Sequence, residues 1–500
     1  MNSLKEYFRK GDPYVLLSSL GLILSLVMVV FFVGIILVKG LSIFWPSDVE
    51  LVQLKDGTKY LGELWSSEEN KITNPDHSIN VVPKVQYKTG NRDIYGFDFK
   101  WIDKSEIESI SNPADATVFE RKEYGNFYGF IKKVAFKGKE YTKNNELFDK
   151  ATEALDYSEN LVEKQADLMK SGNPDAEDKI EKLNAEISSI QILIESADGS
   201  LNTFSLSKFV GFYQPNQMNL FEKSIHYLLN IWTFISGEPR ESNTEGGVFP
   251  AIFGTVMMVI LMSVLVVPFG VLAAVYLNEY AKQGLLTRII RLSVNNLAGV
   301  PSIVYGIFGL GFFIYMIGGS IDTFFFSEKL PEPTYGTGGI LWASLTLALL
   351  TLPVVVVATE EGILAVPKAN KEGALALGAT KWQMIRKIVL PNAAPGILTG
   401  LILAISRGAG EVAPLMITGV VKLAPAMPLD TIFPFFHPDR KFMHLGFHIY
   451  DVGFQSPNVE AAVPMVYSTA LLLIIIVVFL NLLAIFLRNK MRKKYKSASF

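Results

Sequence analysis

The chain has 500 residues, of which 50% are hydrophobic and 19% are charged, and its mean hydropathy is +0.30. This composition excludes an ordinary soluble enzyme of this length and favours a membrane protein. The sequence contains no cysteine, which excludes disulfides, thiolate-ligated zinc and thiol catalysis. The net charge of −2 hides an uneven distribution: residues 46–248 carry 34 acidic and 23 basic side chains, whereas the remainder carries 14 acidic and 23 basic.

Six apolar segments are long enough to cross about 30 Å of hydrocarbon as helices. They are residues 14–38, 249–277, 297–317, 340–358, 396–421 and 463–487. The first segment is too long for a signal peptide and no A-x-A site follows Val38, so we expect a retained anchor. The sequence therefore predicts an all-α polytopic membrane protein with six spans.

Basic residues occupy every second junction between these spans: residues 5–10, 282–291, 368–387 and 488–496. Because Lys and Arg in short loops stay on the cytoplasmic side, we expect both termini to be cytoplasmic. Residues 1–45 then form the cytoplasmic N-terminus and first span, 249–487 the membrane core, and 488–500 a basic cytoplasmic tail. The acidic block 46–248 falls on the extracytoplasmic side.

The acidic block is predicted to be an α+β insertion. Asp56-Gly57 lies between two alternating stretches, a strong hairpin signal, and Thr89-Gly90-Asn91 repeats that pattern. A helical hairpin is expected to follow these β hairpins, with Asn173 and Pro174 starting its second helix. The apolar seams of the two helices are Leu147, Ala151, Ala154, Leu161 and Leu168, and then Ile180, Leu183, Ile187, Ile190 and Ile194. This hairpin is either a docking arm for an extracytoplasmic partner or a passive insertion, and the sequence leaves both open.

No catalytic constellation is present in the sequence. The P-loop pattern G-x-x-x-x-G-K-[ST] is absent, so the chain does not itself bind ATP in that way. His444 and His448 have a metal-compatible spacing, but no carboxylate lies at a useful distance, which favours an ordinary extracytoplasmic loop. We therefore expect no catalytic residue, no metal site and no cofactor bound by this chain.

The basic junction between spans four and five, "EGALALGATKWQMIRKIVLP", predicts a helix, a turn and a second helix at residues 372–391. Gly378 can supply a left-handed turn and Thr380 can cap the second helix. Trp382, Ile385 and Val389 share one face of that helix, and Pro391 is expected to end it. Such an amphipathic helix either lies in the lipid interface or fits a groove on a cytoplasmic partner.

The same junction resembles the cytoplasmic coupling loop of ABC-type importer permeases, whose pattern is E-A-A, three residues, G, nine residues, I-x-L-P. The matching residues are Glu372, Gly378, Ile388, Leu390 and Pro391. Gly373 replaces the first alanine of the pattern, and one small residue for another keeps close packing feasible. The resemblance implies that residues 360–395 dock into a cleft of a separate ATPase subunit and transmit its closure to the spans.

Other stretches narrow the resemblance to the PstA-type permeases of phosphate-specific uptake systems. They are "NNLAGVPSIVYGIFGL", "TLPVVVVATEEGILAVP", "SRGAGEVAPLMITG" and "NLLAIFLRNKMRKK". The resemblance covers residues 10–45 and 249–496 and leaves out the acidic insertion, which is larger than the corresponding loop of the family.

The resemblance implies a non-enzymatic permease subunit that moves inorganic phosphate across the cytoplasmic (inner) membrane of a bacterium. It also implies a second related permease, a dimer of ATP-binding subunits that hold ATP and Mg²⁺, and an extracytoplasmic phosphate-binding protein. Lipid is a further partner and nucleic acid is not. Two alternatives stay open: a permease for sulfate or molybdate, and a membrane-anchored sensor.

Arg407 and Glu411 are charged residues in the predicted fifth span, four residues apart on one helix face. Charges in a membrane span are costly and usually mark a pathway, although the pair could also serve packing alone. A guanidinium offers a planar fork of donors that suits an oxyanion, and a nearby carboxylate would keep the site shallow. Gly408 and Gly410 are predicted to allow a neighbouring helix to approach closely.

Four further residues are candidates for gating. Glu360 and Glu361 end span four just before the coupling loop, where they either respond to its movement or form a solvated helix end. Pro301 and Pro353 interrupt spans three and four, as hinges or as simple kinks.

Overall fold

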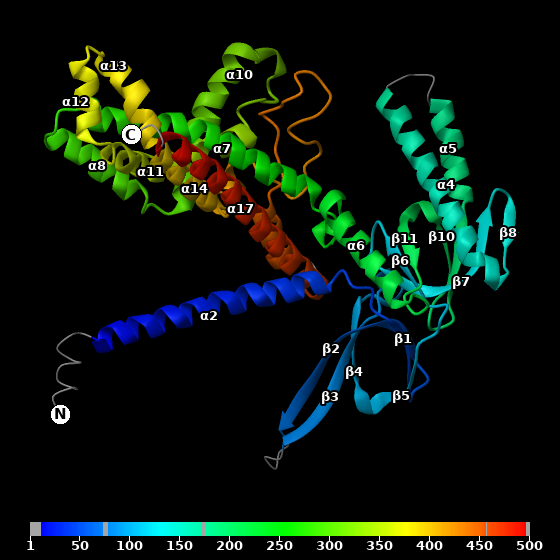
Figure 1. Ribbon diagram of the computed structural model, residues 1–500. Coiled ribbons are helices and arrows are strands. Elements are labelled where there is room, and N and C mark those ends of the chain that lie inside the picture. The colour runs from blue at the N-terminus through cyan, green and yellow to red at the C-terminus, as the bar shows by residue number, and fades with distance from the viewer. Residues whose placement is uncertain (1–11, 74–78, 172–176, 457, 497–500) are drawn as a thin grey trace, which may run out of the picture. The chain divides into compact units, whose positions relative to one another are not determined.

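The computed structural model describes residues 12–73, 79–171, 177–456 and 458–496 (Figure 1). The chain divides into two compact units. The helical unit consists of Met1–Leu41, Ile235–Glu238 and Val248–Phe500, and the strand unit consists of Ser42–Phe234 and Pro239–Gly247. Each unit is described by itself below.

Six helices in the described part of the chain are long and apolar enough to cross a membrane. These spans are Tyr14–Ser42, Phe249–Tyr280, Ser302–Phe325, Ile340–Leu364, Lys381–Gly408 and Val459–Lys493. They contain, in order, α2 (Asp12–Ser42), α7 (Phe249–Val275), α9 (Ser302–Phe308) with α10 (Gly319–Phe325), α11 (Ile340–Leu364), α14 (Leu390–Gly408) and α17 (Val459–Lys496). The prediction of six apolar spans is confirmed.

The centre of the helical unit is α11, which packs against α7 and α14. Its residues are apolar on every side, as expected of a helix surrounded by others. Met262 from α7, Leu347 from α11 and Ala404 from α14 meet in one core and are fully buried. This core joins α14 to α7 and α11.

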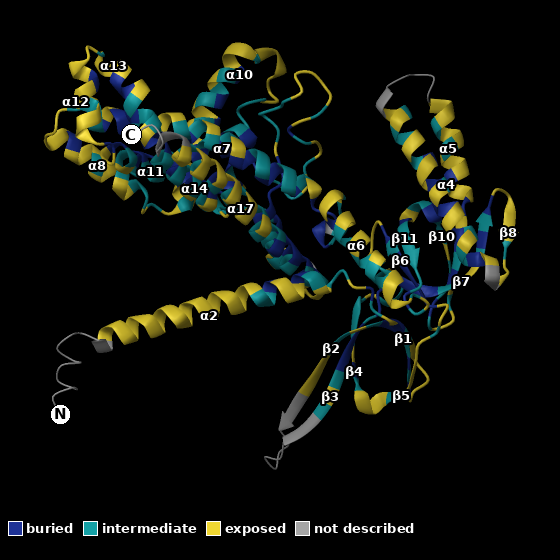
Figure 2. Ribbon diagram, viewed as in Figure 1, coloured by how far each residue is buried: buried dark blue, intermediate teal, exposed yellow. Residues whose placement is uncertain are grey.

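In contrast, α2 is exposed along most of its length (Figure 2). Near its C-terminal end it contacts α17, where the Ser468 hydroxyl donates a 2.7 Å hydrogen bond to the Gly40 carbonyl. A Cβ at Gly40 would lie 2.9 Å from the Tyr467 carbonyl oxygen, so this approach requires glycine. The rest of the α2 surface is apolar, as lipid-facing helices are.

The fifth span differs from its predicted bounds. It begins at Lys381 and ends at Gly408, whereas the sequence predicted 396–421. Pro391 does not end a helix, because it stands at the start of α14, where its missing N–H costs nothing, after a π-helical turn at Ile385–Val389. The third span also shifts: α8 (Leu285–Leu297) ends before it, and Pro301 is the N-cap residue of α9.

The strand unit contains two antiparallel sheets. The first has the order β4-β3-β2-β1-β5 and the second β10-β9-β7-β6-β11, with β8 paired to β7. Their strands are β1 Val49–Leu54, β2 Lys59–Thr73, β3 Ile79–Lys88, β4 Phe99–Asp103, β5 Ile107–Ser111, β6 Thr117–Arg121, β7 Phe127–Phe136, β8 Lys139–Tyr141, β9 Gln191–Glu195, β10 Leu201–Ser205 and β11 Phe209–Tyr213. A smaller ribbon joins β12 (Pro239–Arg240) to β13 (Glu245–Gly246).

The first predicted hairpin is present, since β1 pairs with β2 across a turn in which Gly57 has a φ of +86°. The second differs from prediction. β3 and β4 pair, but residues 89–98 between them include α3 (Arg92–Tyr95), so the connection is longer than a tight turn at Thr89-Gly90-Asn91.

Two helices cover part of the second sheet: α4 (Asn144–Ser171) and α5 (Glu177–Ser189). The predicted capping residues Asn173 and Pro174 lie outside the described residues. The second apolar seam is wrong beyond Ser189, because Ile190, Ile192 and Ile194 are all buried at a period of two and lead into strand β9. Their β-branched side chains favour the strand.

Candidate functional site

The segment between spans four and five folds as a helix, a turn and a helix. α12 (Lys368–Ala376) ends where Gly378 adopts a φ of +83°, as predicted. The Ala379 N–H donates to the Ala374 carbonyl and the Gly378 N–H to the Leu375 carbonyl, which satisfies the last carbonyls of α12. α12 therefore ends at this turn and does not continue into the next helix.

The second helix of the segment, α13 (Lys381–Met384), starts at a capping box. The Thr380 hydroxyl accepts from the Gln383 N–H at 3.2 Å, and the Gln383 side chain accepts from the Thr380 N–H at 2.9 Å. Both bonds satisfy N–H groups at the helix start, so the direction of α13 is fixed by local chemistry.

One face of the segment is anchored and the other is exposed. Ile385 and Val389 are fully buried in a core with Leu277 and Ile363, from the ends of spans two and four. Trp382 was predicted to share their face, but it is 54% exposed. Leu377, at the turn, is 91% exposed. The turn thus presents apolar side chains outward while the helix behind it is fixed to two spans.

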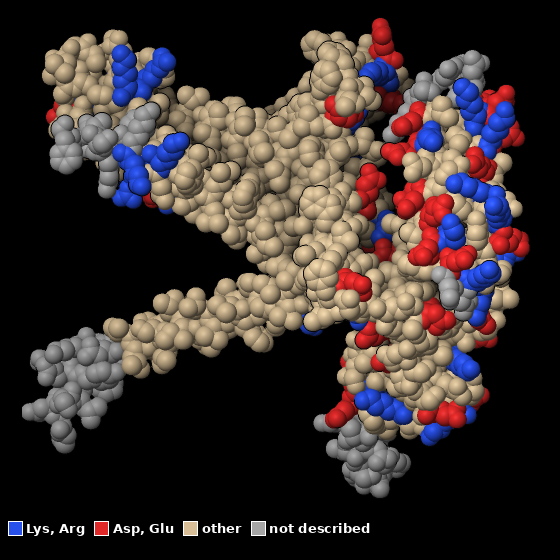
Figure 3. All heavy atoms as spheres, turned by 45° about the vertical axis from the view of Figure 1, so that its right-hand side comes forward, with Lys and Arg blue, Asp and Glu red and all other residues tan. Residues whose placement is uncertain are grey.

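Charged residues tie the segment to span two. Lys371 on α12 forms a 2.6 Å ion pair with Glu279, and the Lys381 ammonium lies 4.8 Å from the centre of the Tyr280 ring. In Figure 3, Lys and Arg gather at one end of the helical unit, whereas the visible middle of its long helices has no charged surface. These contacts join the segment to the last residues of span two.

The five residues that match the coupling-loop pattern occupy distinct positions. Glu372 is exposed on α12, and Gly378 forms the turn. Ile388, Leu390 and Pro391 are half-buried where the segment continues into α14. At Gly373, where the pattern has alanine, an added Cβ would meet nothing within 4 Å, so this departure leaves the packing unchanged.

Arg407 and Glu411 lie close together but not on one helix. Arg407 is in the last turn of α14, whereas Glu411 follows Gly408, the last residue of that helix. The Arg407 Nε and Glu411 Oε1 atoms are 3.9 Å apart, and Arg407 Nη2 donates a 3.4 Å hydrogen bond to the Ala298 carbonyl. The prediction that both occupy the middle of a continuous span is wrong, because the chain leaves the helix between them.

The two glycines of this stretch differ. A Cβ at Gly408 would lie 2.5 Å from the Met262 sulfur of α7, so the end of that flexible side chain would have to move. At Gly410 nothing lies within 4 Å, which corrects the predicted packing role of that residue. Glycine at 410 instead disfavours continuation of the helix and exposes the segment that carries Glu411.

The four gating candidates separate into two kinds. Glu360 is 17% exposed and forms a 3.3 Å ion pair with Arg291, so it is not a solvated helix end, whereas Glu361 is exposed. Asn278 also donates a 3.3 Å hydrogen bond to Glu360. Pro301 marks a break before α9, while Pro353 lies inside the uninterrupted α11.

Sequence reasoning missed the partners of these residues. Arg291 on α8 also donates to the Leu277 carbonyl at 3.2 Å and to the Asn278 side chain at 3.3 Å, which links α8 to the end of span two. The sequence showed that the junctions at residues 282–291 and 368–387 are basic, but not which residues their basic side chains contact. Their mutual contacts depend on tertiary packing of residues far apart in the chain.

The sequence predicted an ordinary extracytoplasmic loop at His444 and His448, but the structure places both residues at a helix. Both are buried at α16 (Leu445–Phe454), which packs against α17. Burial lowers the pKa of His444 to about 3, so its imidazole is neutral at physiological pH. Among the described residues, no group of three His, Asp or Glu side chains could hold a metal ion.

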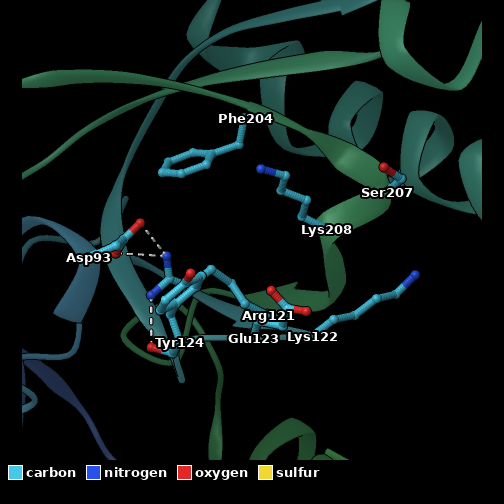
Figure 4. Close-up of a pocket in the computed structure, with 8 residues that line it drawn as sticks. All are labelled: Asp93, Arg121, Lys122, Glu123, Tyr124, Phe204, Ser207 and Lys208. Atoms are coloured by element: carbon cyan, nitrogen blue, oxygen red, sulfur yellow. Dashed lines mark hydrogen bonds and ion pairs between the residues drawn. The ribbon is translucent and has the colours of Figure 1, made fainter. Parts of the chain in front are cut away.

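The strand unit has a cavity of about 300 Å³ (Figure 4). Arg121 at its wall is 4% exposed and donates to both Asp93 carboxylate oxygens at 2.9 Å, and to the Gly125 and Tyr124 carbonyls. These hydrogen bonds compensate for burial of the Arg121 guanidinium, so no ligand is needed to explain why it is buried. The residues lining the cavity are Asp93, Arg121, Lys122, Glu123, Tyr124, Phe204, Ser207 and Lys208.

Comparison with known proteins adds independent information. Residues 266–496 match the family described as "Binding-protein-dependent transport system inner membrane component". The chain is 36% identical over 257 residues to "Phosphate transport system permease protein PstA 1" of Mycobacterium tuberculosis (strain CDC 1551 / Oshkosh), covering 51% of this chain and 75% of that protein. It is 31% identical over 266 residues to "Probable ABC transporter permease protein YqgI" of Bacillus subtilis (strain 168), covering 52% and 84%.

Among solved structures, the inward-facing MetNI methionine ABC transporter matches with a TM-score of 0.36 and 18% sequence identity, over 52% of this chain and 97% of that one. The family assignment rests on the sequence matches. Together with the six spans, they show that this chain is a multi-pass membrane protein that belongs to the binding-protein-dependent transport system inner membrane components, the ABC transporter permeases.

Proposed function

We propose that this chain is the permease subunit of an ATP-driven importer that moves inorganic phosphate across the cytoplasmic membrane of a bacterium. The observation that carries this proposal is the 36% identity over three quarters of a phosphate permease. The segment with an exposed turn and an anchored helix supplies the mechanical connection that such a subunit needs.

The exposed turn of this segment is the proposed contact with a dimer of ATP-binding subunits. Leu377 and Trp382 offer apolar side chains to a groove, and Glu372 offers a charge beside them. ATP and Mg²⁺ belong to that partner. Closure of the ATPase would press on α12 and α13, and the buried Ile385 and Val389 would pass the movement to spans two and four.

Arg407 and Glu411 are the proposed points of contact with phosphate. At 3.9 Å their ion pair is long, and both side chains are about one quarter exposed. A phosphate oxyanion can replace the carboxylate on the guanidinium at low cost, because the two groups offer similar acceptors to the same fork of donors. Glu411 then displaces phosphate again, which keeps binding shallow enough for transit.

A second, related permease would form the opposite wall of the pathway, since one chain supplies a single guanidinium face. In this arrangement both termini are cytoplasmic, as the basic junctions require. The region 46–248, with its strands and helices, is then an extracytoplasmic insertion, on the side from which a soluble phosphate-binding protein delivers its ligand.

The test is transport by the complete assembly. The chain is copurified with its permease and ATPase partners, reconstituted in proteoliposomes with the binding protein and ATP, and given radiolabelled phosphate or sulfate. We expect phosphate accumulation that depends on ATP and is not reduced by excess sulfate. Accumulation of sulfate or molybdate instead would establish the alternative permease, and no ATP-dependent uptake of any oxyanion would contradict the proposal.

A further inference from the structure

Helix α6 (Leu220–Ser236) has an exposed apolar face. Its members are spaced by four, three and four residues, so they form one stripe along the helix. They are Phe221, Ile225, Leu228 and Trp232, which are 73%, 45%, 65% and 66% exposed. Figure 2 shows that much of the α6 surface is exposed. Residues 220–234 of this helix belong to the strand unit. Exposing four large apolar side chains to water is unfavourable in free energy, so a partner that covers this face is expected.

The opposite face of α6 is fixed to the strand unit. The Asn230 side chain donates a 3.0 Å hydrogen bond to the Phe44 carbonyl, and the Tyr227 and Trp45 rings are 5.8 Å apart. The His226 ring contacts the Tyr213 ring of β11, with ring centres 4.3 Å apart and ring planes tilted by 45°. These contacts prevent rotation of the helix, so the apolar stripe cannot turn inward.

The start of α6 is equally well defined. Asn219 and Glu222 form reciprocal 2.9 Å hydrogen bonds between their side chains and each other's backbone N–H groups. Glu222 and Lys223 are the charged residues of the sequence 220–236, and Lys223 pairs with Asp48. The rest of the helix, residues 224–236, has no Asp, Glu, Lys or Arg, so the stripe beyond Phe221 has no charged neighbours on its own helix.

One chain connection of α6 leads into a membrane span, and a hydrogen bond joins the helix to the chain that follows another span. Phe44, which Asn230 contacts, is two residues beyond the end of α2. After Ser236, the residues 237–248 lead to the start of α7, a connection of at most about 40 Å if fully extended. The helix is therefore joined to α7 by residues 237–248 and hydrogen-bonded to the chain just beyond α2.

We propose that α6 lies in the outer headgroup region of the bilayer, with its stripe from Phe221 to Trp232 inserted among the lipid chains. Lipid is the partner favoured by the short chain connection to α7, by the hydrogen bond to Phe44 just beyond α2, and by the aromatic residues at the two ends of the stripe. Trp and Phe suit this depth because an aromatic ring is accommodated at the boundary between headgroups and chains. The inference rests on the membrane location of the chain and is independent of which oxyanion it transports.

The natural absence of cysteine makes a direct test available. Single cysteines at Trp232→Cys, Leu228→Cys and Ile225→Cys are labelled with a nitroxide in the full chain. The labelled protein is reconstituted with its partners in vesicles of phosphatidylethanolamine and phosphatidylglycerol. Electron paramagnetic resonance then compares collisions with oxygen, which concentrates in lipid, and with a water-soluble nickel chelate. The matched control is Leu201→Cys on β10, because Leu201 is 60% exposed, close to Trp232.

We expect the ratio of oxygen to nickel collisions to be several-fold higher at 225, 228 and 232 than at 201. Equal, water-like ratios at all four positions would overturn the proposal. Low collision rates with both reagents at the stripe would also overturn it, because they would show that a protein covers α6. Three labelled positions on one face keep the test valid if one variant does not fold.

Discussion

Arg407 illustrates how a single side chain can be held in place without being fully satisfied. Its guanidinium contacts one backbone carbonyl at 3.4 Å and one carboxylate at 3.9 Å, both longer than good charge-assisted hydrogen bonds. A tight, buried ion pair would resist exchange with a passing anion. The long contacts favour exchange, which is what the proposed pathway requires.

Replacing Arg407 tests this role. We expect Arg407→Gln to reduce phosphate uptake by roughly ten- to a hundredfold, since a hydrogen bond to a charged group contributes about 1.5–3 kcal/mol. Arg407→Lys keeps the charge but lacks the fork and should be intermediate. Uptake by proteoliposomes is measured at several phosphate concentrations, and copurification of the ATPase should be unchanged.

Glu411→Gln is the companion variant to Arg407→Gln. Without the competing carboxylate, phosphate should be held more tightly, so we expect both the KM for phosphate and the maximal rate to fall. Wild-type uptake by Arg407→Gln, or an unchanged KM in Glu411→Gln, would show that the pair serves packing alone.

At the residue scale, the sequence correctly predicted that Arg407 and Glu411 lie close together, but it wrongly placed both on one continuous helix. The spacing of Arg407 and Glu411 predicted a shared helix face, but α14 ends at Gly408. The low helix propensity of Gly410 favours this end, but the spacing of the two charged residues does not show where the helix stops. The contact of Glu360 with Arg291 was not predictable either, because it depends on tertiary packing of residues far apart in the chain.

At the scale of elements, the coupling segment was predictable because its signals are local. Gly378 and Thr380 act through their own backbone and the residues three or four positions away, so sequence alone located the turn. The exposure of Trp382 was not predictable from the sequence. The helix continues through Pro391 into α14, and its buried face is the one that packs against the ends of spans two and four.

Two glycines of this segment form a matched pair. An added Cβ meets nothing within 4 Å at either Gly373 or Gly378, but Gly378 alone of the two has a positive φ. We expect Gly378→Ala to destabilise the turn by about 1–2 kcal/mol and to weaken ATPase binding by up to roughly tenfold. Gly373→Ala should stabilise α12 by about 0.5–1 kcal/mol and leave binding intact. Titration of the purified ATPase against each variant measures both effects, and equal affinities would contradict the assigned role of the turn.

The strand unit contains a half-buried carboxyl, that of Glu63, which makes the stability of this unit depend on pH. Burial raises the pKa of Glu63 on β2, whose Oε1 accepts a 2.9 Å hydrogen bond from the Tyr128 hydroxyl on β7. Because the folded state favours the protonated form, this carboxyl contributes stability at low pH and loses it as the pH rises through its raised pKa.

Glu63→Gln should therefore slow amide hydrogen exchange in β2 and β7 at pH 7, since glutamine keeps the acceptor without the charge. The difference from the wild type should shrink as the pH falls toward the ordinary glutamate range, about 4.3. Glu68→Gln, on the exposed side of the same strand, is the control and should change nothing. Faster exchange in Glu63→Gln than in the wild type at pH 7 would show that the ionised carboxylate stabilises the folded state, contrary to the assigned pH dependence.

At the scale of the whole molecule, the uneven charge distribution predicted where the chain changes character. The acidic segment 46–248 falls in the strand unit except for Ile235–Glu238 and Val248, and the apolar spans lie in the helical unit. Each unit has cores of its own: one centred on Leu347 of α11, another on Ile192 and Ile194 beside α4. The sheet order could not be predicted, because the alternating pattern of a strand does not identify its neighbours.

Separate cores imply that the helical unit folds without the insertion. We expect a chain in which residues 50–240 are replaced by a short Gly-Ser linker to insert in the membrane, to copurify with the ATPase, and to retain part of its phosphate uptake. The family match lies entirely within 266–496, outside the deleted segment. Deleting residues 372–391 is the contrasting variant, which should abolish ATPase binding while leaving hydrogen exchange of the strand unit unchanged. A sensor whose output depends on the insertion would lose its signal entirely in the first variant, so full loss of activity together with intact ATPase binding would favour sensing over transport.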